Sequence, residues 1–384
     1  MKRSLALAAA LCLLGAAPPA NYNAFGVAVL QRLGAQSQSE NVFISPVSIG
    51  VALAMAADGA AGTTRTALLH GLQFNGPNLA ESNAALIASL QSNHDAHVGI
   101  ADAIWLRNDV PPSPHYVALL RNSYGAQAQA LHFGDPSAAA AINAWTKEHT
   151  LGLIDHLVDS TDPLDFAFLT NALVFQGNWS VPFEHNATSP QPFTDASGLK
   201  HNVQMMSQTA FFQTIDEPSF RALRLPYGQG GYAAYVLLPT GSDVNALVRA
   251  LSASTLDHVA HAAQSEDIAV QLPRFTATYS ASLNDALSSL GMGAAFLNGA
   301  DFSPMHAPPP RLRISSVIHK AYVRVDEAGT VAAAATSVEM HMTMMRSARP
   351  LQPFIVNRPF VFALRDERTG ALLFIGVIRT LPPA

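Results

Sequence analysis

Hydrophobic positions in the first part of the chain recur at the three- and four-residue spacing of amphipathic helices. The stretch 22–34 carries such a stripe and is expected to close at its final glycine. A second helix is predicted to begin after Ser45, an N-cap residue followed by Pro46, and to stop at Gly59. The segment 138–152 predicts a third helix.

The second half of the chain changes to the patterns of β-strands. The stretch 169–179 is apolar on both faces, which is typical of a central strand. Two apolar runs around a Gly-rich turn predict a hairpin over 221–239, and the C-terminal stretch 358–378 predicts a second one. Strands are also expected at 267–279 and 311–325, with one helix between them. Helices first and strands later predict an α+β domain.

Composition supports a globular chain and argues against a nucleic-acid partner. Of the 384 residues, 49% are hydrophobic and only 13% are charged, which excludes a disordered protein. The net charge is −5 and no basic block occurs, so no electrostatic footprint for nucleic acid exists. Pro and Gly residues are spread throughout without a linker or repeat, which indicates one compact domain.

The first twenty residues have the layout of a secretory signal peptide. Lys2 and Arg3 precede an apolar run and a group of small residues, and cleavage is expected between Ala16 and Asn21. The run is too short for a membrane span of ~20 residues, and no other stretch is suitable, so no membrane contact is expected. A buried first helix is the alternative interpretation. We therefore expect a signal peptide at 1–20, a single mature domain at 21–384, and a secreted or periplasmic location. Cys12, the one cysteine, lies within the signal segment.

No motif for catalysis or metal binding is present. The chain lacks the G-x-S-x-G elbow of hydrolases and the H-E-x-x-H pattern of zinc proteases. His94 and His97 lack a third ligand, and two Gly-rich pieces are better interpreted as turns. We therefore expect a protein that is not an enzyme and that needs neither a metal nor a cofactor.

Five segments, in order along the chain, resemble the serpin family. They are 41–72 (NVFISPVSIGVALAMAADGAAGTTRTALLHGL), 171–183 (NALVFQGNWSVPF), 298–305 (NGADFSPM), 317–336 (VIHKAYVRVDEAGTVAAAAT) and 354–362 (FIVNRPFVF). The resemblance implies about nine helices and three β-sheets, with an exposed reactive loop at about 327–349. In inhibitory members this loop baits a serine or cysteine protease, which attacks it and forms an acyl-enzyme. The cleaved loop then inserts as a new central strand, and the trapped protease is distorted.

The loop sequence meets the physical demands of such an insertion. No proline, which a central strand cannot accommodate, occurs from Ala328 to Arg349. Side chains alternate between an apolar set that includes Thr330 and a set that turns polar and includes Val331, as in a half-buried strand. The leading part is small, which favours insertion between neighbours. The predicted hinge consists of Glu327, Gly329, Thr330, Ala332, Ala333, Ala334, Ala335 and Thr336.

The resemblance also assigns supporting residues around the insertion point. Glu327 matches the acidic residue before the hinge, Arg274 its basic partner, and Trp179 the tryptophan beneath the loop. Ser45, Ser48, Asn171 and His319 match a polar cluster where the central strands part. A hydroxyl, amide and imidazole network of this kind could satisfy two strand arrangements in turn.

The sequence departs from the family pattern in two respects. Val331 stands where the family usually has Glu, but it belongs to the outer set of the alternation. Counting from the hinge sets the reactive bond at Thr343-Met344, whereas counting back from the last strands favours the later bond Arg346-Ser347. The first suits elastase-like or chymotrypsin-like pockets, and the second suits proteases with an acidic pocket.

The expected partner is therefore a target serine protease, held in a covalent complex by a monomeric inhibitor. No Lys or Arg occurs from 66 to 106, where members activated by glycosaminoglycans carry their basic helix, so no such activation is expected. The alternative function is a serpin-fold binding or chaperone protein that does not inhibit. Such members tend to carry bulky or charged residues in the hinge, where this chain has Thr330 and alanines.

Cleavage by the target protease should release a C-terminal peptide that begins at Met344, because the distance from hinge to bond sets how far the protease is carried. Mass spectrometry of the peptide after incubation with elastase, chymotrypsin or trypsin measures this start. A peptide that begins at Ser347 would show that the count from the hinge is wrong.

Overall fold

A computed structural model describes residues 18–306, 312–330 and 353–384. Nine α-helices occur in these ranges: α1 (Asn23–Gln36), α2 (Pro46–Asp58), α3 (Gly62–Gly71), α4 (Leu79–Gln91), α5 (Pro114–Leu119), α6 (Pro136–His149), α7 (Val244–Ala250), α8 (Ala253–Ala262) and α9 (Asn284–Leu287). Shorter 3-10 and π turns are η1 (Leu120–Tyr124), η2 (His185–Ala187), η3 (Ser288–Met292) and η4 (Gly293–Phe296). Among the described residues, no helix is long and apolar enough for a membrane span.

The strands number fifteen within the same ranges. They are β1 (Val42–Ile44), β2 (Ala96–Arg107), β3 (Gln127–Leu131), β4 (Ala167–Asn178), β5 (Ser189–Thr194), β6 (Lys200–Asp216), β7 (Phe220–Tyr227), β8 (Tyr232–Pro239), β9 (Gln264–Pro273), β10 (Phe275–Ser282), β11 (Ser316–Val325), β12 (Gly329–Thr330), β13 (Phe354–Ile355), β14 (Phe360–Asp366) and β15 (Leu372–Ile378). The prediction of an α+β fold is confirmed.

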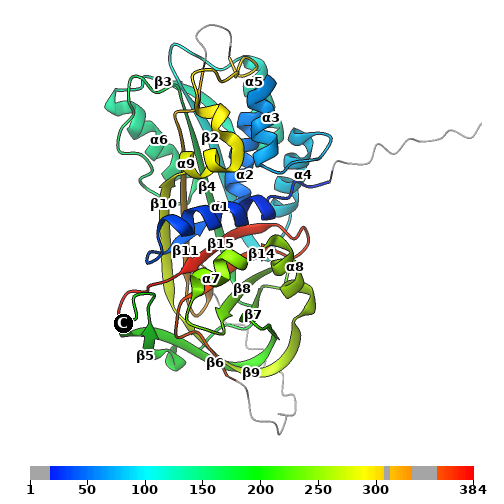
Figure 1. The fold of residues 1–384 in the computed structure, drawn as a ribbon, viewed down its shortest axis with the longest axis vertical. Helices are drawn as coiled ribbons and strands as arrows, with labels where there is room; N and C mark the ends of the chain where they lie inside the picture. Colours follow the sequence, from blue (N-terminus) through cyan, green and yellow to red (C-terminus); the bar gives the residue numbers. More distant parts are fainter. Residues whose placement is uncertain (1–17, 307–311, 331–352) are drawn as a thin grey trace, which may run out of the picture.

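The strands join into two hydrogen-bonded sheets. One has six strands in the order β10-β11-β12-β4-β2-β3, and the other has nine, β1-β15-β14-β8-β7-β6-β9-β13, with β5 paired to β6. The resemblance implies three sheets. In this structure the long strand β6 joins two groups of strands into one sheet, because its beginning pairs with β5 and its end pairs with β7. Figure 1 shows the helices α3 to α6 gathered at one end of the molecule and β5 to β9 at the other.

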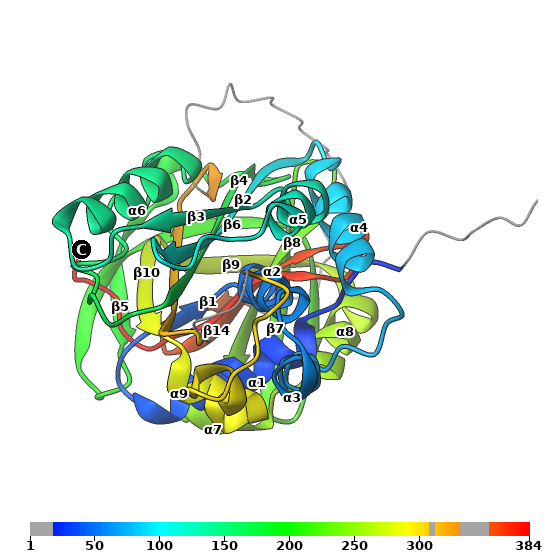
Figure 2. The same ribbon diagram turned by 90° about the horizontal axis from the view of Figure 1, so that it is seen from above.

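The six-stranded sheet is covered by helices on both faces (Figure 2). Ile104 and Leu106 of β2 lie in the main core together with α2, which is buried along almost its whole length. The alternate residues Ala103 and Trp105 pack instead with α6, through Ile142. A strand covered on both faces is expected to be mainly apolar on both, and β4 is buried along nearly its whole length, with Thr170 and Asn171 as polar exceptions.

The first predicted helix ends later than expected. It was expected to close at Gly34, but α1 continues to Gln36. Gly34 lies inside the helix, where its carbonyl accepts from Nη2 of the buried Arg379, and it is not a stop signal. By contrast, Ser45 caps α2 as predicted by accepting from the Ser48 N–H.

Three strands before residue 132 were not predicted, namely β1, β2 and β3. β2 and β3 precede residue 132, in a region expected to be mainly helical, and they form one end of the six-stranded sheet. The two predicted hairpins do form, as β7 with β8 and β14 with β15. The expected helix at 280–291 is short, because α9 has only four residues before it passes into η3.

Candidate functional site

The segment expected to be a hinge already lies between two central strands of the six-stranded sheet. β12 is antiparallel to both neighbours, with Thr330 opposite Val325 of β11 and opposite Gly177 of β4. Further along, β4 and β11 pair directly and in parallel, through 168–171 and 316–319. The sheet is thus open at one end, where β12 fills it, and closed at the other.

Gly329 fits its place because no side chain could. A Cβ on this residue would lie 2.1 Å from the carbonyl oxygen of Gly177 on β4, and its φ is +156°. Real Cβ atoms do not approach backbone oxygen so closely, and any other residue would push the strand out. Glycine is therefore required where the chain first passes between β11 and β4.

An aromatic pair lies beneath β12 and holds it. Thr330 is fully buried, and its hydroxyl is 2.5 Å from the Tyr227 hydroxyl. Burial raises the pKa of Tyr227, so the phenol keeps its proton. The Tyr227 ring stacks on Trp179 at 4.3 Å between centroids. The Trp179 indole N–H donates to the Asp326 carbonyl, and its backbone N–H donates to the Ala328 carbonyl. Side chain and backbone together anchor the turn before the hinge.

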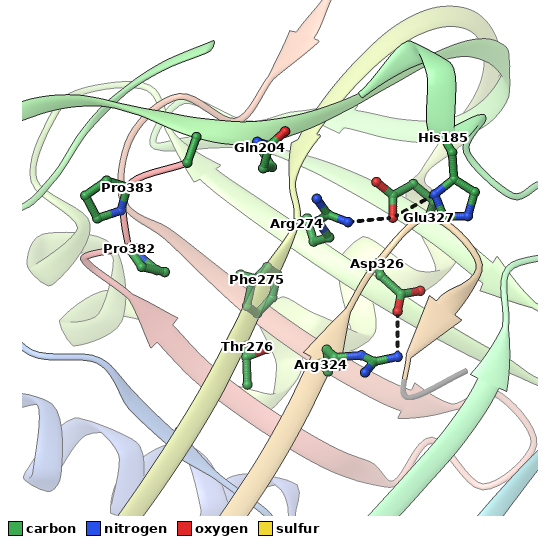
Figure 3. Close-up of a pocket in the computed structure, with 11 residues that line it drawn as sticks. His185, Gln204, Arg274, Phe275, Thr276, Arg324, Asp326, Glu327, Pro382 and Pro383 are labelled. Carbon is green, nitrogen blue, oxygen red and sulfur yellow. Dashed lines mark ion pairs between the residues drawn. The ribbon is translucent and has the colours of Figure 1, made fainter. Parts of the chain in front are cut away.

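Glu327 is a buried acid at the start of this turn, with only 1% of its side chain exposed. One carboxylate oxygen, Oε1, accepts from the Thr188 hydroxyl at 2.8 Å. The other, Oε2, lies 3.6 Å from Arg274 Nη1 and also 3.6 Å from His185 Nδ1, without a hydrogen bond among the described residues. Figure 3 shows the Arg274 and His185 side chains pointing toward Glu327 from different segments. The expected basic partner is therefore in place, but it is one of two.

A cavity of about 480 Å³ opens beside these residues. Arg324 forms an ion pair with Asp326 across its edge at 3.0 Å, as Figure 3 shows. Its other lining residues include Gln204, Phe275 and Thr276. The acids and bases around it are paired with one another. In the described ranges, no group of three or more His, Cys, Asp or Glu residues could hold a metal ion.

The second group of expected residues forms a polar cluster where the direct pairing of β4 and β11 ends. His319 Nε2 accepts from the Ser45 N–H at 3.2 Å, so the ring proton is on Nδ1, which donates to Asn171 Oδ1 at 2.6 Å. The Ser48 hydroxyl donates to the same oxygen at 3.2 Å, and Asn171 Nδ2 donates to the Ile318 carbonyl at 3.4 Å. Burial lowers the pKa of His319 to about 3, so the imidazole is neutral. The cluster ties α2, β4 and β11 together.

The structure therefore brings the expected residues together in two places on the same pair of strands. Glu327, Gly329 and Thr330 lie with Arg274 and Trp179, while the polar cluster lies on the same strands, roughly 23 Å along β4 at 3.3 Å per residue. The other expected positions lie outside the described residues: Ala332, Ala333, Ala334, Ala335, Thr336, Thr343, Met344, Arg346 and Ser347.

Three functional contacts were not anticipated from the sequence. Tyr227, His185 and Thr188 each bind the hinge turn, yet all come from segments distant in the chain. Tyr227 belongs to a predicted hairpin, but no local signal shows which way its hydroxyl points. His185 follows the predicted central strand closely and could have been suspected as a second cation for Glu327.

Comparisons with known proteins agree on one family. A family model described as Serpin (serine protease inhibitor) matches residues 20–381. An uncharacterized serpin-like protein of Thermococcus kodakarensis is 33% identical over 344 residues, which cover 88% of this chain and 80% of that protein. The crystal structure of the thermophilic serpin Tengpin in its native state has a TM-score of 0.86 at 30% identity, with 94% of each chain covered.

Human thyroxine-binding globulin, crystallised in complex with thyroxine, has a TM-score of 0.87. The alignment covers 94% of this chain and 98% of that one, at 24% identity. A likeness at this identity shows the fold alone.

The buried pair of Tyr227 and Thr330 should stabilise the uncleaved protein. Tyr227→Phe and Thr330→Val should each lower the free energy of unfolding by about 1–2 kcal/mol, because each leaves the partner hydroxyl buried without a partner. The double variant should lose less than the sum of the two, with a coupling of about 0.5–1.5 kcal/mol. Urea unfolding measures all three values. Additive losses would show that the two hydroxyls do not interact.

Proposed function

The chain belongs to the serpin family, and on that premise we propose that it is a secreted suicide inhibitor of serine proteases. The target attacks the reactive bond and becomes linked to the loop as an acyl-enzyme. The free end of the loop then inserts into the six-stranded sheet and carries the protease with it. The inhibitor supplies a strand and no nucleophile. The signal-peptide pattern at 1–20 supports secretion.

The observation that carries this proposal is the place of β12. Gly329 and Thr330, near the start of the loop, lie between β11 and β4 and pair with both. A loop that continued as an antiparallel strand would therefore enter the same sheet without a change of register.

The observed register also sets how far the loop could insert before it met resistance. A strand that continued from Thr330 in register would bring Thr336 opposite both Asn171 and His319, which are themselves opposite each other. Residues 331–335, of which four are alanines, would fill the part where β4 and β11 have no direct pairs. Small side chains suit this step, since they need little clearance.

Beyond Thr336, insertion must break the direct ladder between β4 and β11. It must also break the bond between Asn171 and His319. We propose that this closed end is the kinetic barrier that keeps the uncleaved form in place, while two full rows of new strand hydrogen bonds drive insertion afterwards. Roughly 14 residues of inserted strand would move the cleaved end by about 45 Å.

We further propose that the inhibitor acts as a monomer and without a glycosaminoglycan. The lack of Lys and Arg in 66–106, which includes the whole of α4, supports the second point. The reactive bond is proposed at Thr343-Met344, with Arg346-Ser347 as the alternative.

Thr330→Arg should convert the inhibitor into a substrate, because Thr330 is fully buried between β11 and β4 and a guanidinium there would block insertion. Val331→Arg adds the same charge one residue later, on the outer set of the alternation, and should keep the activity. Each variant is incubated with elastase, trypsin and subtilisin and analysed on denaturing gels. We expect SDS-stable complex from the wild type and Val331→Arg, and cleavage without complex from Thr330→Arg.

An equal yield of complex from Thr330→Arg and Val331→Arg would contradict insertion at β12. Cleavage of the wild type with no complex and no gain in thermal stability would favour the binding or chaperone alternative.

A further inference from the structure

Asp102 is a buried acid in the middle of the six-stranded sheet, next to the polar cluster. It lies on β2 and only 3% of it is exposed. Its side chain shares a strand face with Ile104 and Leu106, which belong to the main core. No part of the proposed inhibitory mechanism uses a carboxyl group at this position.

Neither oxygen of the Asp102 carboxyl has a hydrogen-bond partner among the described residues. Other buried acids differ in this respect. Asp366 accepts from Thr369 and Asn93, and Glu327 accepts from Thr188. A buried polar group without a partner is costly, and a buried charge without a partner is far more so.

The titratable and charged groups around Asp102 supply no compensating cation. Tyr22, before α1, interacts electrostatically with both Asp102 and Asp58 of α2. Tyr116 of α5 and Tyr124 of η1 interact with Asp58, and His319 of β11 contacts Asn171, the residue opposite Asp102. Asp58 already pairs with Arg65, and His319 is neutral because burial lowers its pKa to about 3. Burial likewise raises the pKa of Asp102 well above its usual value. The carboxyl thus keeps its proton to a higher pH than an exposed Asp does.

The position of Asp102 couples it to the opening of the sheet. It is directly opposite Asn171 of β4 in the antiparallel register, and opposed side chains in a sheet lie about 4.5–5.5 Å apart at Cβ. In the closed sheet the Asn171 Nδ2 donates to the Ile318 carbonyl of β11. When β4 leaves β11, that amide loses its acceptor, and the nearest acid on the neighbouring strand is Asp102.

We propose that Asp102 is a pH-sensitive control on the opening of the sheet, neutral while the sheet is closed and ionised when it opens. The neutral acid is compatible with the closed arrangement. The ionised acid is not compatible with the closed arrangement, because it would be a buried charge without a partner. Once β11 has moved away, the ionised acid can accept a hydrogen bond from the Asn171 amide. Rising pH therefore weakens the closed sheet and promotes strand separation. The link to loop insertion rests on the proposed function, whereas the effect on stability does not.

The direction of the pH effect follows from linkage. In the unfolded chain the Asp102 carboxyl has an ordinary pKa of about 3.9, and in the folded protein its pKa is raised. Between these two values the folded state binds the extra proton. The contribution of this group to stability is complete below the unfolded pKa and is lost as pH rises through the folded pKa. The unfolding equilibrium constant should rise about tenfold per pH unit in that window.

The first test measures the urea-unfolding midpoint of the uncleaved full chain from pH 4 to 9, for the wild type and Asp102→Asn. Asparagine has the same shape but cannot ionise. The variant should match the wild type near pH 4 and become increasingly more stable above it. Should Asp102→Asn fail to fold, Asp102→Leu serves instead and should likewise remove the pH slope. Asp58→Asn is the matched control. Asp58 is paired with Arg65, so this substitution should lower the stability by removing the ion pair. Parallel pH profiles for wild type and Asp102 variants would overturn the proposal.

The second test links the same group to insertion. The rate at which the uncleaved protein loses its ability to form SDS-stable complex is followed at pH 6 and pH 9. It should rise with pH in the wild type and change little in Asp102→Asn. The same rise in both proteins would overturn the coupling to sheet opening. If neither protein forms a complex at any pH, the inhibitory function fails, and the stability profiles still decide whether Asp102 is a pH-sensitive group.

Discussion

The direct pairing of β4 with β11 is the constraint on which the rest of the molecule depends. Four parallel residue pairs and the bond between Asn171 and His319 hold these strands together below β12. β4 is buried on both faces, whereas β11 is buried on one face and partly exposed on the other, so β4 cannot move without disturbing the side that packs on α2 or on α6. A sheet that is open at one end and closed at the other is poised for one further strand, and the proposed inhibitory function uses this property.

The open end is stabilised by contacts that converge on a short turn. Glu327 is held by Thr188, Arg274 and His185, while the backbone on either side is held by Trp179. Each bond is modest, and the two ion pairs at 3.6 Å are loose. The turn can therefore be ordered before cleavage and still be released, as the proposed mechanism requires. Asp102 adds a second influence, at the closed end.

Much of the site could be recognised in the sequence because it depends on local rules. Ser45 and Pro46 indicated the start of α2, and the apolar residues on both faces of β4 indicated a strand buried on both faces. Of the small, proline-free stretch after Glu327, Gly329 and Thr330 lie between two strands, and its later residues are outside the described ranges. Where the rules were ambiguous the prediction was wrong. Gly34 looked like a helix stop, but α1 continues through it to Gln36.

The sequence by itself determined the family and the α+β class, because motifs, periodicity and capping act over a few neighbouring residues. Only the tertiary structure decided that β12 already lies between β11 and β4, that Tyr227 and His185 bind the hinge, and that Asp102 is left without a partner. These facts depend on which distant segments meet and on which way each side chain points. In a sheet whose neighbours come from all parts of the chain, no local pattern carries that information.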